Sequence, residues 1–223
     1  FAGGKELSDM AVYHSIVVFG TSITRGSFDS VGGGWVSRLS AYVGARIPPE
    51  RGTDIIEVYN LGISGDTSRG VRERFASELT PRADGAEYSR VTVLLEVGGN
   101  DALFNTKTNT HWVEPAEYIA NVEACVAEVK RRGFRIVLLG LHKPDEERTN
   151  PIPWDPECAY RWSDCKVYDD ALQTIAAREQ LLYIPQHDIL GPEHLLDGDH
   201  PNAKGHQLIF ERIKEYLEKA NII

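Results

Sequence analysis

The chain has 223 residues, of which 42% are hydrophobic and 26% are charged, values ordinary for a globular protein long enough to bury a sizeable core. Asp and Glu total 33 against 24 Lys and Arg, which gives a formal net charge of −9 at pH 7. This acidic balance, without a basic run, argues against a nucleic-acid or anionic-membrane partner. No apolar run approaches the ~20 residues that cross a bilayer, so we expect no membrane span.

The N-terminus lacks the basic and then apolar pattern of a signal peptide. The only methionine is Met10, just before the first apolar run. We therefore expect a single domain over residues 10–223, with residues 1–9 an N-terminal remnant that is not native to the protein. The sequence leaves the oligomeric state open.

Five short apolar runs alternate with helical patterns along the chain. The runs, which we expect to be strands, are Ser15–Phe19, Ile55–Leu61, Val91–Val97, Arg135–Leu141 and Leu181–Ile184. The helical patterns cover Gly34–Arg46, Ser68–Leu79, Pro115–Arg132, Lys166–Glu179 and Ala203–Lys219. Strands that alternate with helices predict a parallel sheet with helices on both faces.

One long segment, His142–Cys165, does not fit this alternation. Its closely spaced prolines exclude a regular helix, and it contains the large aromatic residues Trp154, Tyr160 and Trp162. Because it follows the fourth predicted strand, it lies at the carboxyl edge of the sheet. It is either a lid or substrate wall, or an irregular excursion whose aromatic residues pack on the body.

The three cysteines are too few and too unevenly spaced for a disulfide framework. They are Cys125, Cys158 and Cys165. Cys158 and Cys165 flank part of the proline-rich segment and can pair if oxidised. We expect free thiols instead, and a cytoplasmic location.

Four short motifs contain the residue types that acyl transfer needs. They are Gly20-Thr21-Ser22, Asn60–Thr67, Gly98–Asp101 and Asp197–Pro201. The first three follow the first three predicted strands. Because the carboxyl ends of parallel strands meet at one edge of a sheet, these three motifs converge there.

Ser22 is the predicted nucleophile, since a serine at a strand end becomes reactive when a base takes its proton. His200 has a suitable pKa for that base, and Asp197, three residues earlier, can orient its ring. The backbone N–H groups of Ser22 and Gly65 and the side-chain amide of Asn100 can donate hydrogen bonds to an oxyanion. Taken alone, Ser22 reads as a turn or cap residue; the other motifs reverse that interpretation.

Together the four motifs resemble those of the SGNH hydrolases, also called the GDSL esterase and lipase family, over most of the chain. By this resemblance the catalytic residues are Ser22, Asp197 and His200, and the oxyanion hole consists of Ser22, Gly65 and Asn100. It also implies a three-layer α/β/α sandwich of the flavodoxin-like type, with a five-stranded parallel sheet. The implied substrate is a small-molecule ester, and no cofactor is needed.

The sequence departs from the family at Thr21, where the family has aspartate. Threonine carries no charge, and we expect its hydroxyl to hold the turn through hydrogen bonds and to take no proton. Aspartates and histidines gather between His187 and His206, but without a recognised zinc spacing, so we expect no metal. The Gly32-Gly33-Gly34-Trp35 run lacks the spacing of a nucleotide-binding loop.

The sequence thus predicts a serine esterase that works through an acyl-enzyme on short acyl esters, acetylated sugars possible among them. Two alternatives stay open. One is an acyltransferase that uses the same residues, with a second alcohol in place of water. The other is a binding module that kept the fold and has only weak catalysis.

Overall fold

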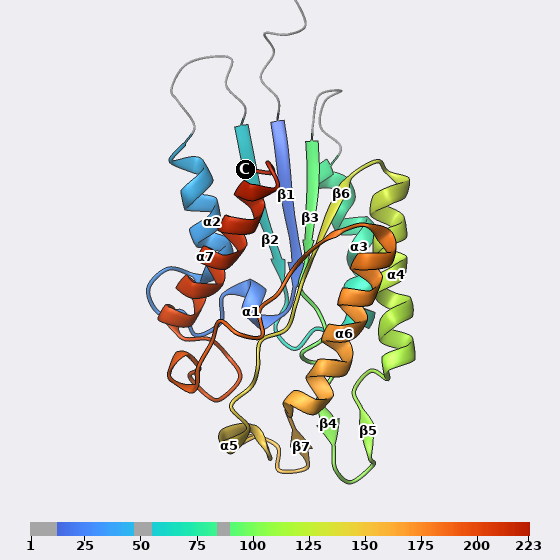
Figure 1. The fold of residues 1–223 in the computed structure, drawn as a ribbon, viewed down its shortest axis with the longest axis vertical. Helices are drawn as coiled ribbons and strands as arrows, with labels where there is room; N and C mark the ends of the chain where they lie inside the picture. The colour runs from blue at the N-terminus through green and yellow to red at the C-terminus, as the bar shows by residue number, and fades with distance from the viewer. Residues whose placement is uncertain (1–12, 47–54, 84–89) are drawn as a thin grey trace, which may run out of the picture.

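The structure, a computed structural model, describes residues 13–46, 55–83 and 90–223. Met10 and the expected domain boundary beside it lie outside these residues. A five-stranded sheet occupies the centre, with the order β2-β1-β3-β6-β8 and all neighbours parallel (Figure 1). Its strands are β1 (Tyr13–Gly20), β2 (Ile55–Gly62), β3 (Arg90–Leu95), β6 (Arg135–Leu139) and β8 (Leu182–Ile184). In chain order this is 2-1-3-4-5, the flavodoxin-like arrangement, so the predicted fold is confirmed.

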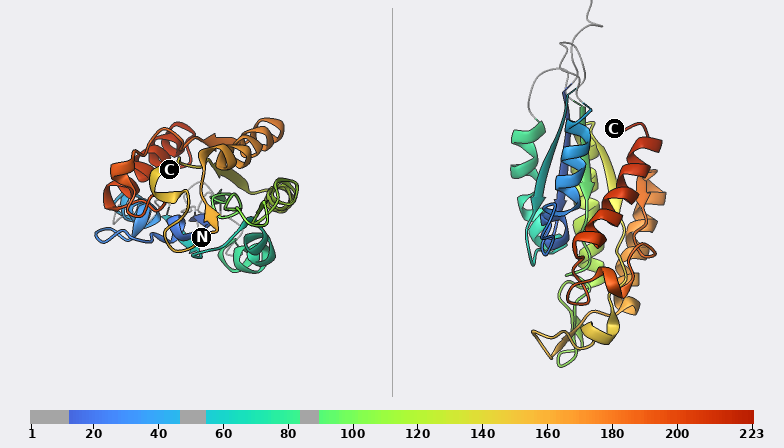
Figure 2. Two further views of the ribbon diagram at one scale, coloured as in Figure 1. Left: turned by 90° about the horizontal axis from the view of Figure 1, so that it is seen from below. Right: turned by 90° about the vertical axis from the view of Figure 1, so that its left-hand side faces the viewer.

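Helices cover both faces of the sheet and make three layers (Figure 2). One face packs against α2 (Gly34–Gly44) and α7 (Ala203–Lys219). The other face packs against α3 (Ser68–Ala83), α4 (Pro115–Arg131) and α6 (Trp162–Glu179).

The side chains of β1 show why this strand is apolar throughout. Successive residues of a strand point to opposite faces, so Ile16 and Val18 join the core beneath α2 and α7 while Val17 and Phe19 join the opposite core. All four are 0% exposed. A strand buried on both faces reads as a continuous apolar run, which is the pattern that predicted it.

The largest differences from the predicted helix boundaries are at the end of α3 and at the start of α6. α3 continues past Leu79 to Ala83 with Pro81 inside its last turn, because both Leu79 and Ala83 are buried in the core. α6 begins at Trp162 and not at Lys166. Its first turn places Cys165 in the core, and this burial favours helix from Trp162 onward.

A second, small antiparallel sheet lies beyond the carboxyl edge of the main sheet, at the bottom of Figure 1. It consists of β4 (Phe104–Asn105), β5 (Thr110–His111) and β7 (Cys158–Ala159), in the order β5-β4-β7. Together with the short helix α5 (Glu146–Thr149), β7 belongs to the proline-rich segment. This segment is therefore ordered, and it is hydrogen-bonded to the chain that follows β3.

The cysteines Cys125, Cys158 and Cys165 are all buried and unpaired with one another. Within the described ranges, no helix combines the length and the apolar character that crossing a bilayer requires.

Candidate active site

Ser22 is the first residue of a short helix, α1 (Ser22–Arg25), that follows β1 directly. The turn is tight: a Cβ on Gly20 would lie 2.1 Å from the Thr24 hydroxyl oxygen, so glycine is required there. The Thr21 carbonyl accepts a hydrogen bond from the Arg25 N–H at 2.9 Å. The Thr21 hydroxyl makes no capping hydrogen bond. The expectation that this hydroxyl holds the turn is therefore wrong, because a backbone hydrogen bond closes it.

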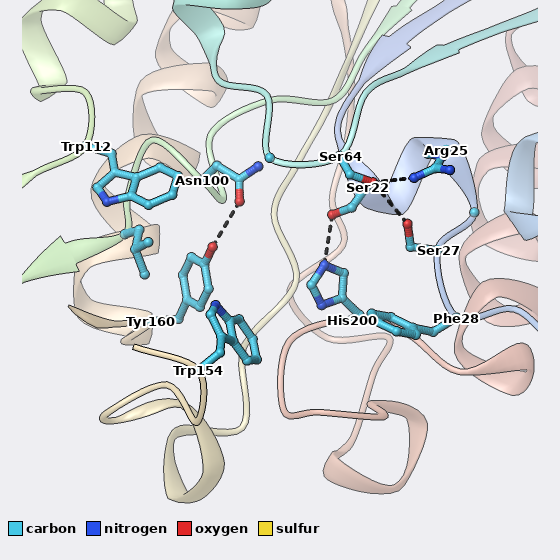
Figure 3. A pocket seen from close by; sticks show the side chains of 13 residues that line it. Ser22, Arg25, Ser27, Phe28, Ser64, Asn100, Trp112, Trp154, Tyr160 and His200 are labelled. Atoms are coloured by element: carbon cyan, nitrogen blue, oxygen red, sulfur yellow. Dashed lines mark hydrogen bonds between the residues drawn. The ribbon is translucent and has the colours of Figure 1, made fainter. Parts of the chain in front are cut away.

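A continuous chain of hydrogen bonds joins Ser22, His200 and Asp197. The Ser22 Oγ lies 2.9 Å from the Nε2 atom of His200 (Figure 3). The Nδ1 atom of His200 lies 2.8 Å from the Oδ2 atom of Asp197. Since a carboxylate only accepts, Nδ1 carries the proton and Nε2 is free to accept from the serine hydroxyl. The other carboxylate oxygen, Oδ1, accepts from the backbone N–H of His200 at 2.8 Å. One aspartate thus holds both the ring and the backbone of the same histidine.

The electrostatics of this pair suit a base. Burial alone would lower the pKa of His200, but the hydrogen bond to Asp197 and the charges of Asp199 and Asp197 outweigh burial and raise the pKa above its ordinary value. Burial alone would raise the pKa of Asp197, but the hydrogen bonds from the side chain and backbone of His200 lower it to about 2. Asp197 is therefore ionised at neutral pH and stabilises a proton on His200.

Two backbone donors face the same pocket as the serine. Ser22 and Gly65 both line it, and neither backbone N–H has an acceptor among the residues that the structure describes. Gly65 has a φ of +77°, a conformation that favours glycine, while a Cβ there would meet nothing within 4 Å. Backbone geometry and not crowding therefore explains the glycine.

Asn100 lines the pocket too, and contacts on both ends fix its side-chain amide. Its Nδ2 atom donates to the Asp66 carbonyl at 2.7 Å, and its Oδ1 atom accepts from the Tyr160 hydroxyl at 2.9 Å. Only one orientation of the amide satisfies both partners, and it leaves the second N–H of Nδ2 available. Next to it, the buried Asp101 carboxylate accepts from the Ser68 N–H at 3.0 Å and ties this loop to the start of α3.

The sequence did not reveal the role of Tyr160. This side chain is only 5% exposed and comes from the proline-rich segment, just after β7. The one available signal was the gathering of aromatic residues in a segment expected at this edge. Nothing in the local sequence indicated a contact with Asn100.

An open pocket of about 740 Å³ is lined by Ser22, Gly65, Asn100, Tyr160 and His200, among others. In Figure 3, Trp112, Trp154 and Tyr160 lie on one side of Ser22 and His200. Arg25 and Ser27 lie on the other side. Trp112 and Trp154 are 47% and 55% exposed, so their rings are open to a ligand. Trp162 does not line this pocket and stacks on His187.

The aspartates and histidines near the C-terminus have separate partners. Asp188 pairs with Arg212, the His194 ring accepts from the Gly191 N–H, and the His206 ring contacts the Ser27 carbonyl. Within the described part of the chain, no three His, Cys, Asp or Glu side chains are grouped so that they could hold a metal ion.

Comparisons with known proteins show a family and similar folds. A profile of the GDSL-like Lipase/Acylhydrolase family matches residues 18–208. The fold is similar to that of an alpha/beta hydrolase from the metagenome of Lake Arreo, Spain, at 22% identity and a TM-score of 0.69, over 95% of this chain and 98% of that one. A lipase/acylhydrolase from Enterococcus faecalis is 24% identical with a TM-score of 0.69, over 93% and 96%.

A third similar structure is a catalytic mutant of an acetylxylan esterase from Geobacillus stearothermophilus. It is 21% identical with a TM-score of 0.67, and the match covers 94% of this chain and 96% of that one. At these identities the structures support the fold and not a substrate. The chain matches no curated protein sequence.

Proposed function

We propose that this chain, which belongs to the GDSL-like lipase/acylhydrolase family and is a carboxylic ester hydrolase, uses Ser22, His200 and Asp197 as its catalytic triad. The observation that carries this proposal is the hydrogen-bond chain from Ser22 Oγ through His200 to Asp197, with distances of 2.9 and 2.8 Å. Ser22 and His200 line a pocket into which the backbone N–H groups of Ser22 and Gly65 bring two donors without acceptors among the described residues.

The reaction starts when His200 Nε2 takes the proton of the Ser22 hydroxyl while Oγ attacks the ester carbonyl carbon. The carbonyl oxygen becomes an oxyanion, which accepts hydrogen bonds from the N–H groups of Ser22 and Gly65 and from the amide of Asn100. When the tetrahedral intermediate collapses, His200 gives its proton to the leaving alkoxide, and an acyl-enzyme remains. Water then repeats the attack with His200 as base, and the carboxylic acid leaves.

Asp197 does not exchange the proton. It keeps the His200 ring in the tautomer that accepts at Nε2 and stabilises the imidazolium that forms in each step. Each oxyanion donor contributes about 10²–10³-fold to kcat in enzymes of this chemistry. No step requires a metal or an organic cofactor.

For the substrate we propose short acyl esters, with acetylated sugars among them. The pocket is wide and open, and its exposed rings Trp112 and Trp154 offer flat faces on which a sugar ring can stack. The fold similarity to an acetylxylan esterase points the same way. We propose water as the acyl acceptor, because the exposed pocket residues keep the acyl-enzyme accessible to solvent.

Hydrolysis of p-nitrophenyl acetate by the wild type and by Ser22→Ala tests the proposal. We expect Ser22→Ala to lower kcat by about 10⁴-fold or more, since a triad fails without its nucleophile. Ser77→Ala, at an exposed serine of α3 away from the pocket, is the matched control and should behave like the wild type. A sulfonyl fluoride should modify Ser22, as peptide mapping will show; an adduct elsewhere refutes the assignment.

A further inference from the structure

The pocket contains one positive charge that no carboxylate neutralises. Arg25 is exposed, and its Nη1 atom donates to the Ser64 hydroxyl at 3.1 Å. No Asp or Glu of the described residues forms an ion pair with it. Two other arginines of the same region differ in this respect: Arg38 pairs with Asp29, and Arg74 pairs with Asp66.

The backbone of Arg25 is held in place from two sides. Its N–H donates to the Thr21 carbonyl at 2.9 Å, within the nucleophile turn. On the other side, β2 ends against it: a Cβ on Gly62 would lie only 2.3 Å from the Arg25 nitrogen. The Asn60 side chain donates to the Thr24 carbonyl at 2.9 Å. The guanidinium therefore extends from a fixed position near Ser22 and not from a free surface loop.

Two hydroxyl groups accompany this cation. The Ser27 and Ser64 oxygens lie 3.3 Å apart, and both residues line the pocket. Figure 3 shows Arg25, Ser64 and Ser27 joined by hydrogen bonds. Trp112, Trp154 and Tyr160 lie on the opposite side of Ser22 and His200. The pocket thus has an aromatic side and a side rich in hydrogen-bond donors.

The charge balance of the pocket is opposite to that of the chain. The sequence has a net charge of −9, yet no Asp or Glu lines this pocket. When His200 is neutral, which its role as base requires, Arg25 is the remaining charge among the lining residues. A guanidinium with neighbouring hydroxyls is the donor set that binds a carboxylate or a phosphate.

We propose that Arg25, Ser27 and Ser64 form a subsite for an anionic group, a carboxylate or a phosphate, on the ester substrate. This inference rests on the proposed function, because it places the ester at Ser22. The anion lies on the Arg25 side, and the rest of the substrate extends along the aromatic side. An anionic ester then binds better than a neutral ester of the same shape.

Two pairs of esters test the subsite, one with the charge on the alcohol and one with the charge on the acyl group. The first pair is para-carboxyphenyl acetate and the neutral para-carbamoylphenyl acetate. The second is the mono-p-nitrophenyl ester of adipic acid and its methyl ester. In at least one pair, we expect the wild type at low salt to prefer the anionic ester by roughly tenfold in kcat/KM, the value of one charge-assisted hydrogen bond.

The matched variants are Arg25→Gln and Arg131→Gln, which remove the same charge inside and outside the pocket. Arg131 is exposed on α4 and pairs with Glu128. We expect Arg25→Gln to bring the anionic-to-neutral ratio to about one, Arg25→Lys to keep part of it, and Arg131→Gln to keep all of it. High salt should reduce the ratio in the wild type, because the subsite is open to solvent. Inorganic phosphate should inhibit the wild type more strongly than Arg25→Gln if the subsite also binds phosphate.

A wild-type ratio near one in both pairs overturns the subsite. So does a ratio that changes equally in Arg25→Gln and Arg131→Gln. Should Arg25→Gln fail to fold, Arg25→Lys and the salt dependence of the wild type decide the question alone. Failure of the proposed function has a separate signature: Ser22→Ala would keep hydrolysing the neutral esters.

Discussion

Tyr160→Phe tests whether one tyrosine orients the oxyanion donor. The change deletes only the hydroxyl that donates to Asn100 Oδ1 at 2.9 Å, in a side chain that is 5% exposed. The Asn100 amide then keeps only its 2.7 Å hydrogen bond to the Asp66 carbonyl, so the amide group can rotate. A hydrogen bond whose partner is left unpaired is worth about 1–3 kcal/mol.

If that free energy is lost from the transition state, kcat falls by roughly 10- to 100-fold, since about 1.4 kcal/mol corresponds to a factor of ten. This is less than the full loss of an oxyanion donor, about 10²–10³-fold. KM should change little, because the developing oxyanion and not the ground-state ester depends on the amide. The pH profile should keep its midpoint, because the triad is untouched.

Tyr168→Phe is the control for stability. Tyr168 is 0% exposed, and its hydroxyl donates to the Val113 carbonyl at 2.6 Å, outside the pocket. Both variants should melt at a lower temperature than the wild type, but only Tyr160→Phe should lose kcat on p-nitrophenyl acetate. If kcat of Tyr160→Phe stays within about twofold of the Tyr168→Phe value, then Tyr160 supports the fold alone and the reasoning is refuted.

The triad and the pocket lead to four further predictions. Protonated His200 cannot accept the serine proton, so kcat/KM should rise with pH, with a midpoint above the ordinary histidine pKa because Asp197 and Asp199 raise the pKa of His200. Asp197→Asn weakens the largest contribution that raises this pKa, so it should move the midpoint to lower pH and reduce kcat by about 10⁴-fold; an unmoved midpoint would contradict the pairing. Turnover should survive exhaustive EDTA treatment, and a loss that zinc or manganese restores would indicate metal catalysis. Acetyl or butyryl esters should have higher kcat/KM than decanoyl esters, because the open, aromatic pocket offers no deep apolar channel; a chain-length series measures this.

The main sheet was predictable because its central strands β1, β3 and β6 are buried on both faces. A short apolar run such as Ile16–Phe19, separated from the next run by a helical pattern, predicts a buried strand. The strands β4, β5 and β7 were not predictable, since two residues show no periodicity. Their pairing joins Phe104 to Ala159 across a long stretch of chain, and only the folded protein brings these residues together.

The site was predictable where its residues belong to short motifs and unpredictable where they meet through space. Asp197 and His200 are three residues apart, and one turn explains their contact. Tyr160 and Asn100 are 60 residues apart, and no local pattern links them. Arg25 stood beside the predicted nucleophile, but its significance depends on the absence of carboxylates among the lining residues, which sequence order does not show.

Thr21 illustrates how a single position can mislead. Its replacement of the family aspartate suggests a nucleophile turn without a carboxyl group, but Glu96, which follows β3, accepts a hydrogen bond from the Thr24 hydroxyl of that same turn. Burial raises the pKa of the Glu96 carboxyl to about 7, although the hydrogen bond from Thr24 opposes this. At neutral pH this group is therefore only partly ionised. The negative charge of Glu96 helps to raise the pKa of His200, and this influence grows as the pH passes through about 7.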